Sequence, residues 1–367
     1  MSFKKNTSRY TDDFNSMIRI AILNSLGFFF LGFFVPIIAR INMNASGTQI
    51  GWITSSLTIG YLLSSTFVGI LTDRIKKRRI LIFIGSIGRG TSYFIIYLGI
   101  IINSLSILWI GWAILGFGAG FFWIPFDTIV SEKSNKDHRA HAFGKRDAAN
   151  ATGQLIGALF GFGLLLIIGF FTNNIALLYI VILFYGIANY YSGFMFLKKI
   201  DESIKFASVQ IENEEQEEKI KFRRLLTKAM LLGIIILFSL VLISSINANL
   251  WRPFINIYIL ETISDNIDVV IFIYLPAGIL ATLLSPKIGE IVDKFNPRIG
   301  IIITSLLGAL MTWLLINTTI LWIFAIIVMM DLAIGMASGL IFRNFLSRIN
   351  IEHRGKIIAI SQRGYRL

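Results

Sequence analysis

Long apolar stretches alternate with short charged ones along most of the chain. A helix needs about 20 mostly apolar residues to cross a bilayer. Ten stretches meet this requirement, at 17–39, 50–72, 80–102, 105–130, 148–171, 174–197, 229–252, 267–288, 299–316 and 319–342. An eleventh begins near Gly355 but reaches only Leu367, too short to cross because a helix rises about 1.5 Å per residue. The pattern predicts an all-α integral membrane protein with ten full transmembrane helices and a truncated eleventh.

Composition supports a membrane protein and excludes several other classes. Of the 367 residues, 55% are hydrophobic and 15% are charged, whereas about 25% of residues are charged in soluble domains. With so few charged groups the chain cannot cover a water-soluble globule, so we expect no soluble enzyme. The chain has no cysteine, no His-Glu-x-x-His sequence and no glycine-rich phosphate loop. We therefore expect neither a metal nor another cofactor.

Basic residues indicate the orientation. The formal net charge is +13, and lysines and arginines gather in alternate loops beside the apolar stretches, which argues against a nucleic-acid partner. These loops include residues 4–9, 74–79, 133–146, 198–228 and 294–298. Because loops rich in Lys and Arg stay on the cytoplasmic side, we expect a multi-pass protein of the cell membrane whose N-terminus is cytoplasmic.

A ten-residue segment recurs in the two halves of the chain. Gly69-Ile-Leu-Thr-Asp73-Arg74-Ile-Lys-Lys-Arg78 follows the second apolar stretch, and Gly289-Glu-Ile-Val-Asp293-Lys294-Phe-Asn-Pro-Arg298 follows the eighth, 220 residues later. Self-similarity at a fixed offset indicates duplicated architecture. We therefore predict a six-helix bundle over 1–197, a cytoplasmic linker over 198–228 and an incomplete second bundle over 229–367.

Both segments resemble the signature loop of the major facilitator superfamily of secondary transporters, Gly-x-Leu-x-Asp-Arg-x-Gly-Arg-Arg/Lys. The first copy matches it at Gly69, Leu71, Asp73, Arg74 and Arg78, whereas Lys76 replaces the second glycine. The resemblance implies two pseudo-symmetric bundles that these loops lock together at the cytoplasmic side. It also implies that Asp73 faces the start of the eleventh helix, near Gly355, and that Asp293 faces the start of the fifth, near Asp147.

The chemistry of this loop suits a gate. Asp73 lies at a helix end, where its carboxylate can cap the N-terminus of another helix. Asp127, at the cytoplasmic end of the fourth apolar stretch, is the candidate partner for the Arg74 side. The alternative is that these charges are solvated and serve only to set topology.

Ionisable residues at bilayer depth are costly and often functional. Asp331 lies near the middle of the tenth apolar stretch, in a helix that the resemblance places beside the central cavity. We interpret it as a contact for a proton, another coupling ion or a basic solute, with a structural carboxylate as the alternative. Arg89, between two glycines in the third stretch, is interpreted as a structural charge partner in preference to a substrate contact.

Other polar residues are candidates for a solute site. Asn247, Asn249 and Arg252 precede Pro253 at the outer end of the seventh stretch, where proline would break the helix and open a site or a gate. A plain helix end explains them equally well. Asn24 lies four residues before Phe28, which predicts a shared helix face, and is a candidate cavity residue.

These observations predict a secondary transporter that moves a small solute, with a proton or another ion as a coupling partner, by alternating access. Aromatic residues in the expected cavity helices favour amphipathic solutes, and efflux of such compounds is one form that the transport could take. The alternatives are a non-transporting membrane receptor or scaffold with the same fold, and an inactive fragment.

Overall fold

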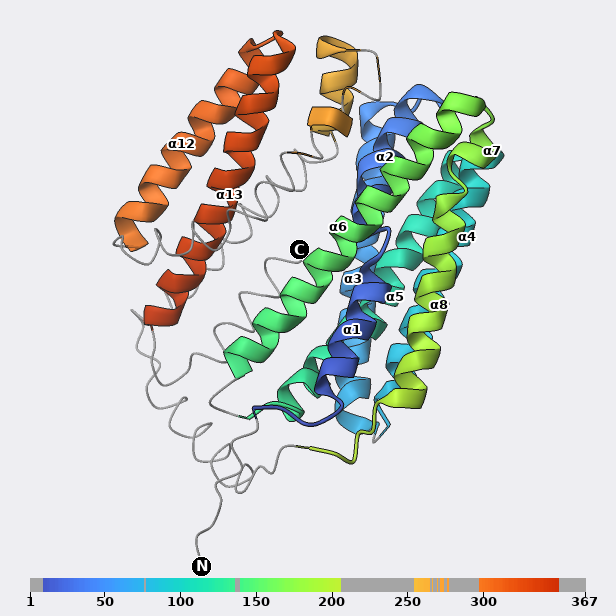
Figure 1. The fold of residues 1–367 in the computed structure, drawn as a ribbon, viewed down its shortest axis with the longest axis vertical. Helices are drawn as coiled ribbons and strands as arrows, with labels where there is room; N and C mark the ends of the chain where they lie inside the picture. The colour runs from blue at the N-terminus through green and yellow to red at the C-terminus, as the bar shows by residue number, and fades with distance from the viewer. Residues whose placement is uncertain are drawn as a thin grey trace, which may run out of the picture. The chain divides into compact units, whose positions relative to one another are not determined.

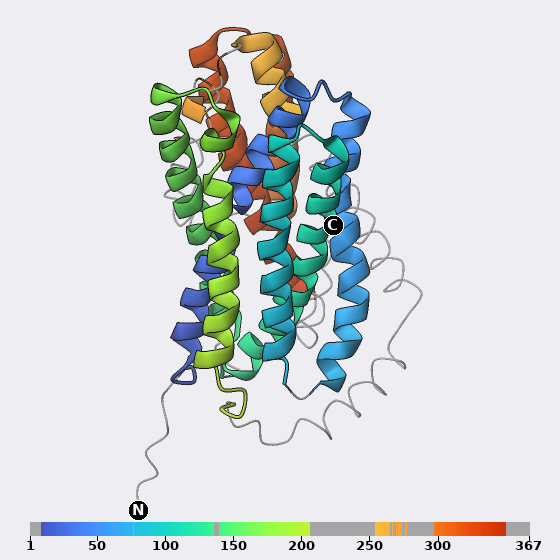
Figure 2. The same ribbon diagram turned by 90° about the vertical axis from the view of Figure 1, so that its right-hand side faces the viewer.

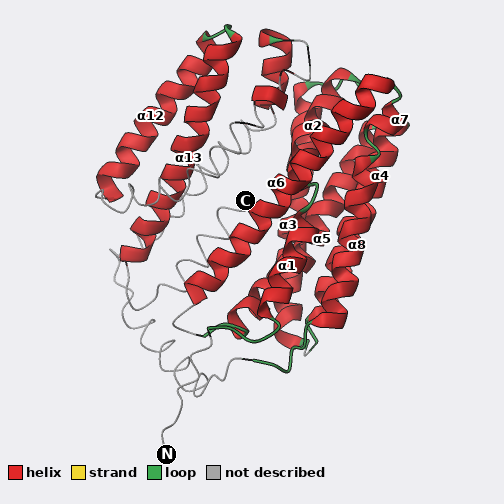
Figure 3. Cartoon of the chain, viewed as in Figure 1, coloured by secondary structure: helices red, strands yellow, loops and turns green. Residues whose placement is uncertain are grey.

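The computed structural model describes residues 9–75, 77–135, 139–205, 254–264 and 297–349, with a few single positions between 266 and 276. The chain divides into two compact units, Met1–Ile235 and Ile236–Leu367 (Figure 1). The described residues form helices and connecting turns without a named strand (Figure 3). One isolated bridge, between Tyr10 and Ser134, is the extent of their β-pairing.

Eight helices make up the described part of the first unit. They are α1 (Phe14–Ser25), α2 (Phe28–Ile41), α3 (Gly47–Arg74), α4 (Arg79–Ile101), α5 (Leu105–Glu132), α6 (Arg139–Phe171), α7 (Ile175–Leu178) and α8 (Val181–Lys199). The long helices run side by side along one direction (Figures 1 and 2). Helix α4 packs against α5 and α8, α3 packs against α5, and α1 and α2 pack against α6.

Local sequence explains where several helices begin. Ser46 caps α3 by accepting a hydrogen bond from the backbone N–H of Gln49, whose side chain accepts from the N–H of Ser46, which is a complete capping box. Ser104 caps α5 and Asn174 caps α7 in the same way, with one side-chain bond each. These caps satisfy N–H groups that have no partner inside the helix.

The first apolar stretch is broken at its middle. Helix α1 ends at Ser25, α2 begins at Phe28, and Gly27 between them has a φ of 81°. That conformation favours glycine because it lacks a Cβ. The shared helix face predicted for Asn24 and Phe28 is therefore wrong, because the two residues belong to different helices.

Apolar side chains cover the outer faces of the long helices. Phe170, Leu63 and Trp52 expose 85%, 65% and 61% of their surface. Among the described residues, seven helices are long and apolar enough to cross a membrane. Such extensive apolar exposure matches a lipid environment, where apolar side chains face hydrocarbon.

The described part of the second unit has a π-helical turn η2 (Ile259–Ile263) and two long helices, α12 (Pro297–Asn317) and α13 (Leu321–Ile349), which pack against each other. Eight of the ten predicted stretches therefore coincide with described helices. The stretch 229–252, most of 267–288 and the eleventh helix near Gly355 lie outside the described residues. The count of ten and a truncated eleventh stays a prediction.

Candidate functional site

The first signature loop lies at the end of the first unit where α1 begins and α5 and α8 end, here called the polar end. Gly69, Asp73 and Arg74 belong to the last turns of α3, and Arg74 is exposed. Glycine at position 69 could permit close helix contact, but a Cβ there would meet open space among the described residues. Arg78 forms an ion pair with Glu132, the last residue of α5, and its Nε donates to the Thr72 carbonyl at 2.8 Å.

The segment after α8, residues 200–205, is attached to this loop. The Glu202 carboxylate accepts hydrogen bonds from the backbone N–H groups of Arg78 and Arg79, at 2.9 and 2.6 Å. It therefore caps the N-terminus of α4, where a negative charge is stabilised by the helix dipole. Lys205 adds a second link, with its Nζ 3.1 Å from Glu132 Oε2.

Lys133 connects three parts of the polar end. Its side chain is 1% exposed, and its Nζ donates to Asp13 Oδ2 at 2.7 Å and to the carbonyls of Asp201 and Ile204 at 2.6 and 3.0 Å. The exposed Asp201 carboxylate accepts from the Ser203 N–H and hydroxyl, and these bonds hold the pKa of Asp201 below its usual value. The start of α1, the end of α5 and the 200–205 segment are thus joined through one ammonium group.

Asp127 is held by an arginine of the neighbouring helix. Arg146 of α6 places Nε 2.9 Å from Asp127 Oδ1 and Nη1 2.5 Å from Asp147 Oδ1. The Arg146 guanidinium also lies over the Trp123 ring, 4.5 Å from its centre. The structure therefore gives the Asp127 carboxylate a partner other than the expected Arg74, and it links α5 to α6.

A second polar cluster lies inside the first unit, where the end of α1 meets the interiors of α4 and α8. Asn24 of α1 is fully buried and donates to the hydroxyls of Ser86 in α4 and Ser192 in α8, at 3.2 and 2.9 Å. Its Oδ1 accepts a hydrogen bond from Nη1 of Arg89. Asn24, which the sequence suggested for a cavity, therefore joins three helices in the bundle interior.

Arg89 is itself 2% exposed. Its guanidinium carbon lies 5.8 Å from the centre of the Phe122 ring and 5.9 Å from that of Trp123. Its Nε has no hydrogen-bond partner in the described structure. The expected structural role is compatible with the bond to Asn24, although that partner is neutral.

Close packing of glycines shapes the surroundings of this cluster. A Cβ at Gly157 of α6 would lie 2.6 Å from the Gly27 nitrogen, which leaves no room for a side chain. The Tyr185 hydroxyl donates to the Gly157 carbonyl at 2.6 Å, and Ser25 donates to Asn150 Oδ1 at 2.7 Å. The break in the first apolar stretch is thus enclosed by α6 and α8.

Asp331 belongs to α13 of the second unit, and its side chain is partly buried. The described part of that unit shows no hydrogen bond or ion pair to it. The other candidate residues of the second half lie outside the described residues, or outside the described side chains for Arg298: Asn247, Asn249, Arg252, Gly289, Asp293, Lys294 and Arg298.

Known protein families can be compared with the sequence of this chain. The family model described as Major Facilitator Superfamily matches residues 18–366. The chain belongs to the major facilitator superfamily. Membership indicates a multi-pass membrane protein and a transporter, not an enzyme. No curated protein matches the chain.

Solved transporters share the fold of this superfamily member. A bacterial homologue of the human lysosomal transporter Spinster, inward-facing and unoccupied, is 15% identical, with a TM-score of 0.75 over 97% of this chain and 79% of its own. A D-xylose–proton symporter is 15% identical, with a TM-score of 0.68 over 96% and 87%. A nucleoside transporter is 12% identical, with a TM-score of 0.67 over 97% and 88%. At such identities the likeness shows the fold alone.

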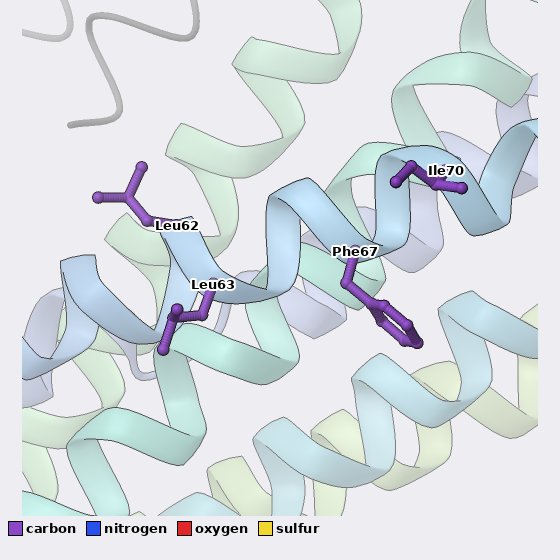
Figure 4. Close-up of a pocket in the computed structure, with 4 residues that line it drawn as sticks. All are labelled: Leu62, Leu63, Phe67 and Ile70. Atoms are coloured by element: carbon purple, nitrogen blue, oxygen red, sulfur yellow. The ribbon is translucent and has the colours of Figure 1, made fainter.

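One surface groove of this superfamily member carries no recognition chemistry. It lies on the outer face of α3 and is lined by Leu62, Leu63, Phe67 and Ile70, all apolar and exposed (Figure 4). A site for a small solute normally combines apolar walls with a few placed polar groups. Among the described residues, the groove therefore offers no polar group that could orient a solute.

Sequence reasoning overlooked the partners that organise the polar end. Lys133 and Arg146 were interpreted only as loop bases, and Glu132 and Glu202 were not singled out, yet each bonds across helices. The available signal was their position just before or just beyond an apolar stretch, where a charged side chain can reach the neighbouring helix end.

Proposed function

We propose that this chain is a secondary transporter that moves a small solute across the cell membrane by alternating access, with the solute bound between two helical bundles. The observation that carries the proposal is the ion pair between Arg78 of the signature loop and Glu132 of α5. A loop that only sets topology needs no such partner. Membership of a transporter family supports the same reading.

The polar end faces the cytoplasm in this proposal, and the N-terminus lies on the same side. Support comes from the basic residues in the loops that meet there, because loops rich in Lys and Arg remain cytoplasmic. Asp127, Glu132 and Glu202 neutralise part of this charge within the first unit.

The signature loops act as a latch that favours the outward-open state. Asp73 of the first loop and Asp293 of the second are the acidic members of the proposed latch, and Arg74, Lys294 and Arg298 are its basic members. A latch worth ~1–3 kcal/mol changes the ratio of two states ~5- to 150-fold. Loss of the latch would leave the carrier trapped in one of its two states and would slow the transport cycle.

The test is transport into proteoliposomes that contain the purified full chain. The panel comprises a radiolabelled pentose, a nucleoside and a cationic amphipathic dye, the last because aromatic residues in the expected cavity helices favour amphipathic solutes. We expect one member to exchange in the wild type, and Asp73→Asn to slow that exchange at least about 5-fold. Asp12→Asn, which alters an exposed carboxylate at the same end, is the matched control and should transport normally.

The transport measurements also distinguish a transporter from a receptor or scaffold. An Asp73→Asn variant that transports like the wild type would contradict the latch. A wild-type protein that folds but exchanges none of the panel would favour the receptor or scaffold reading.

Asp331 is the proposed contact for a proton or another coupling ion, supported by its position in an apolar helix without a described partner. The variant Asp331→Asn should retain solute exchange but lose acceleration by a pH gradient. Equal acceleration in the variant and the wild type would remove Asp331 from the coupling step.

A further inference from the structure

Helices α4 and α8 of the first unit lie side by side (Figures 1 and 2) and share an exposed apolar face, here called the α4–α8 face. On α4, Ile80 and Ile84 are exposed. The ring of Phe83 meets the ring of Phe194 in α8 edge to face, with 5.0 Å between their centres. The exposed residues of α8 recur every three or four positions, which places them along one side of the helix. They are Phe184, Ile187, Tyr191 and Phe194.

Basic side chains of both helices gather where this face reaches the polar end. Lys198 continues the exposed row of α8, and Lys199 follows it; both are exposed in the last turn of that helix. Arg79 of α4 reaches towards α8, where its Nη1 donates to the carbonyl of Leu197 at 3.5 Å. Lys77, in the turn before α4, is exposed as well.

The positive charge of this group is compensated only in part. Two carboxylates lie beside it: Asp201, and Glu202, which caps α4. Among the described residues, no ion pair includes any of the four bases. These are Lys77, Arg79, Lys198 and Lys199. A surplus of two positive charges therefore stands at one end of an apolar face.

We propose that the α4–α8 face binds an anionic phospholipid, with the phosphate at Arg79, Lys198 and Lys199 and the acyl chains along the apolar row. The proposal concerns a lipid neighbour of the first unit and does not depend on transport. Clusters of Lys and Arg at a membrane surface attract anionic head groups. Lysine suits this position because its apolar stem can lie along the row while its ammonium group reaches the head group.

The dimensions of the face match one leaflet of a bilayer. The row from Phe184 to Lys198 has a rise of about 21 Å, at about 1.5 Å per residue. Half of the hydrocarbon core of a bilayer is about 15 Å thick. The acyl chains of one phospholipid therefore fit along the row when its head group lies beside Lys198. A charged end followed by an apolar row also repeats the order of a phospholipid, in which chains follow a head group.

The first test measures thermal unfolding of the purified full chain in detergent, with rising amounts of phosphatidylglycerol or of zwitterionic phosphatidylcholine. We expect phosphatidylglycerol to raise the unfolding temperature more. In the double variant Lys198→Gln, Lys199→Gln, half of this effect should require about 25-fold more phosphatidylglycerol, because each base near an anionic surface contributes about 5-fold. Without phospholipid this variant should unfold like the wild type, because neither lysine has a partner among the described residues.

The matched control removes the same charge elsewhere at the polar end. It is the double variant Arg9→Gln, Arg19→Gln, at two exposed arginines before and within α1, and it should respond to phosphatidylglycerol like the wild type. An equal loss in both double variants would show that the lipid responds to total charge and not to the α4–α8 face. An equal response of the wild type to the two lipids, or no response, would also overturn the proposal.

The second test locates the acyl chains. Tyr191, which is 57% exposed, lies two turns from Lys198 on the same side of α8. In vesicles, the fluorescence added by Tyr191→Trp should be quenched more by phosphatidylglycerol with brominated chains than by brominated phosphatidylcholine at the same mole fraction. This preference should disappear when Lys198→Gln and Lys199→Gln are added. Equal quenching by the two lipids would decide against the proposal even where the unfolding temperature does not respond to lipid.

Discussion

Lys133→Met should loosen the polar end of the first unit. The side chain is almost fully buried, and its ammonium group contacts Asp13 and the carbonyls of Asp201 and Ile204. Methionine has a similar length and no charge, so the change removes the charge with little change in volume. The Asp13 carboxylate would keep its bonds from the Thr11 hydroxyl, at 2.8 Å, and from the Asp201 N–H, at 3.2 Å.

The magnitude follows from these contacts. Breaking a buried ion pair by removing one partner costs about 3–5 kcal/mol. Asp13 retains two hydrogen bonds and its side chain is 12% exposed, so the lower limit applies. We therefore expect about 3 kcal/mol, equivalent to about a 100-fold increase in local opening of the 200–205 segment.

Hydrogen–deuterium exchange of the purified protein measures this opening directly. Peptides that cover 200–205 should lose protection in Lys133→Met, whereas those from the middle of α4 should not. Lys198→Met is the control because Lys198 is exposed at the end of α8. Unchanged protection of 200–205 in Lys133→Met would refute the role assigned to the ammonium group.

Three further changes test the interior and the polar end. Gly27→Ala should destabilise the protein by more than about 1–2 kcal/mol, the cost of the positive φ alone, because the added Cβ would lie 2.3 Å from the Tyr185 ring; an unchanged unfolding temperature would contradict the described break. Tyr185→Phe should cost about 1 kcal/mol through loss of the 2.6 Å bond to Gly157, whereas Tyr191→Phe, at an exposed tyrosine, should be neutral in the same unfolding assay. Ser203→Ala should raise the pKa of Asp201 towards its ordinary value of 3.8, since the hydroxyl bond that lowers it is lost. The ionised Asp201 carboxylate stabilises the turn at 201–203 above its ordinary pKa, and this stability is lost as the pH falls through its lowered pKa. Carboxyl chemical shifts of Asp201 measured below about pH 4 should therefore differ between the variant and the wild type. Identical titrations would show that the Ser203 hydroxyl does not lower the pKa of Asp201.

Hydropathy predicted most spans of the first unit to within a few residues, although α6 begins at Arg139, nine residues before the predicted stretch 148–171. The stretch 105–130 corresponds to α5 and the stretch 80–102 to α4. This succeeds because backbone groups in a bilayer must bond within their own segment, so an apolar stretch of sufficient length has few alternatives to a helix.

The break at Gly27 could not be predicted in the same way. Glycine is common in membrane helices, and Pro36, a stronger helix breaker by sequence, lies inside α2. What decides the position is tertiary contact: the backbone of Gly27 lies against Gly157 and the Tyr185 ring. Such contacts join residues more than 100 positions apart.

The sequence predicted which residues belong to the candidate site, but not which of them bind one another. Asn24, Arg89 and Asp127 were recognised as polar residues in or beside apolar stretches. Their partners depend on helix rotation, which a single sequence does not specify. Rotation of α6 by one residue would separate Arg146 from Asp127. The observed ion pair therefore depends on how the helices pack, which hydropathy does not determine.

The attachment of residues 200–205 beneath α4 also limits how far the chain that follows α8 can extend. An extended chain covers at most about 3.3–3.6 Å per residue. Six attached residues therefore shorten the length available to that connection by roughly 20 Å. Glu202, Lys133 and Lys205 hold the segment together, so removing all three attachments would return that length without inserting a residue. The slack available to the chain that follows α8 is thus set by three charged side chains at the polar end.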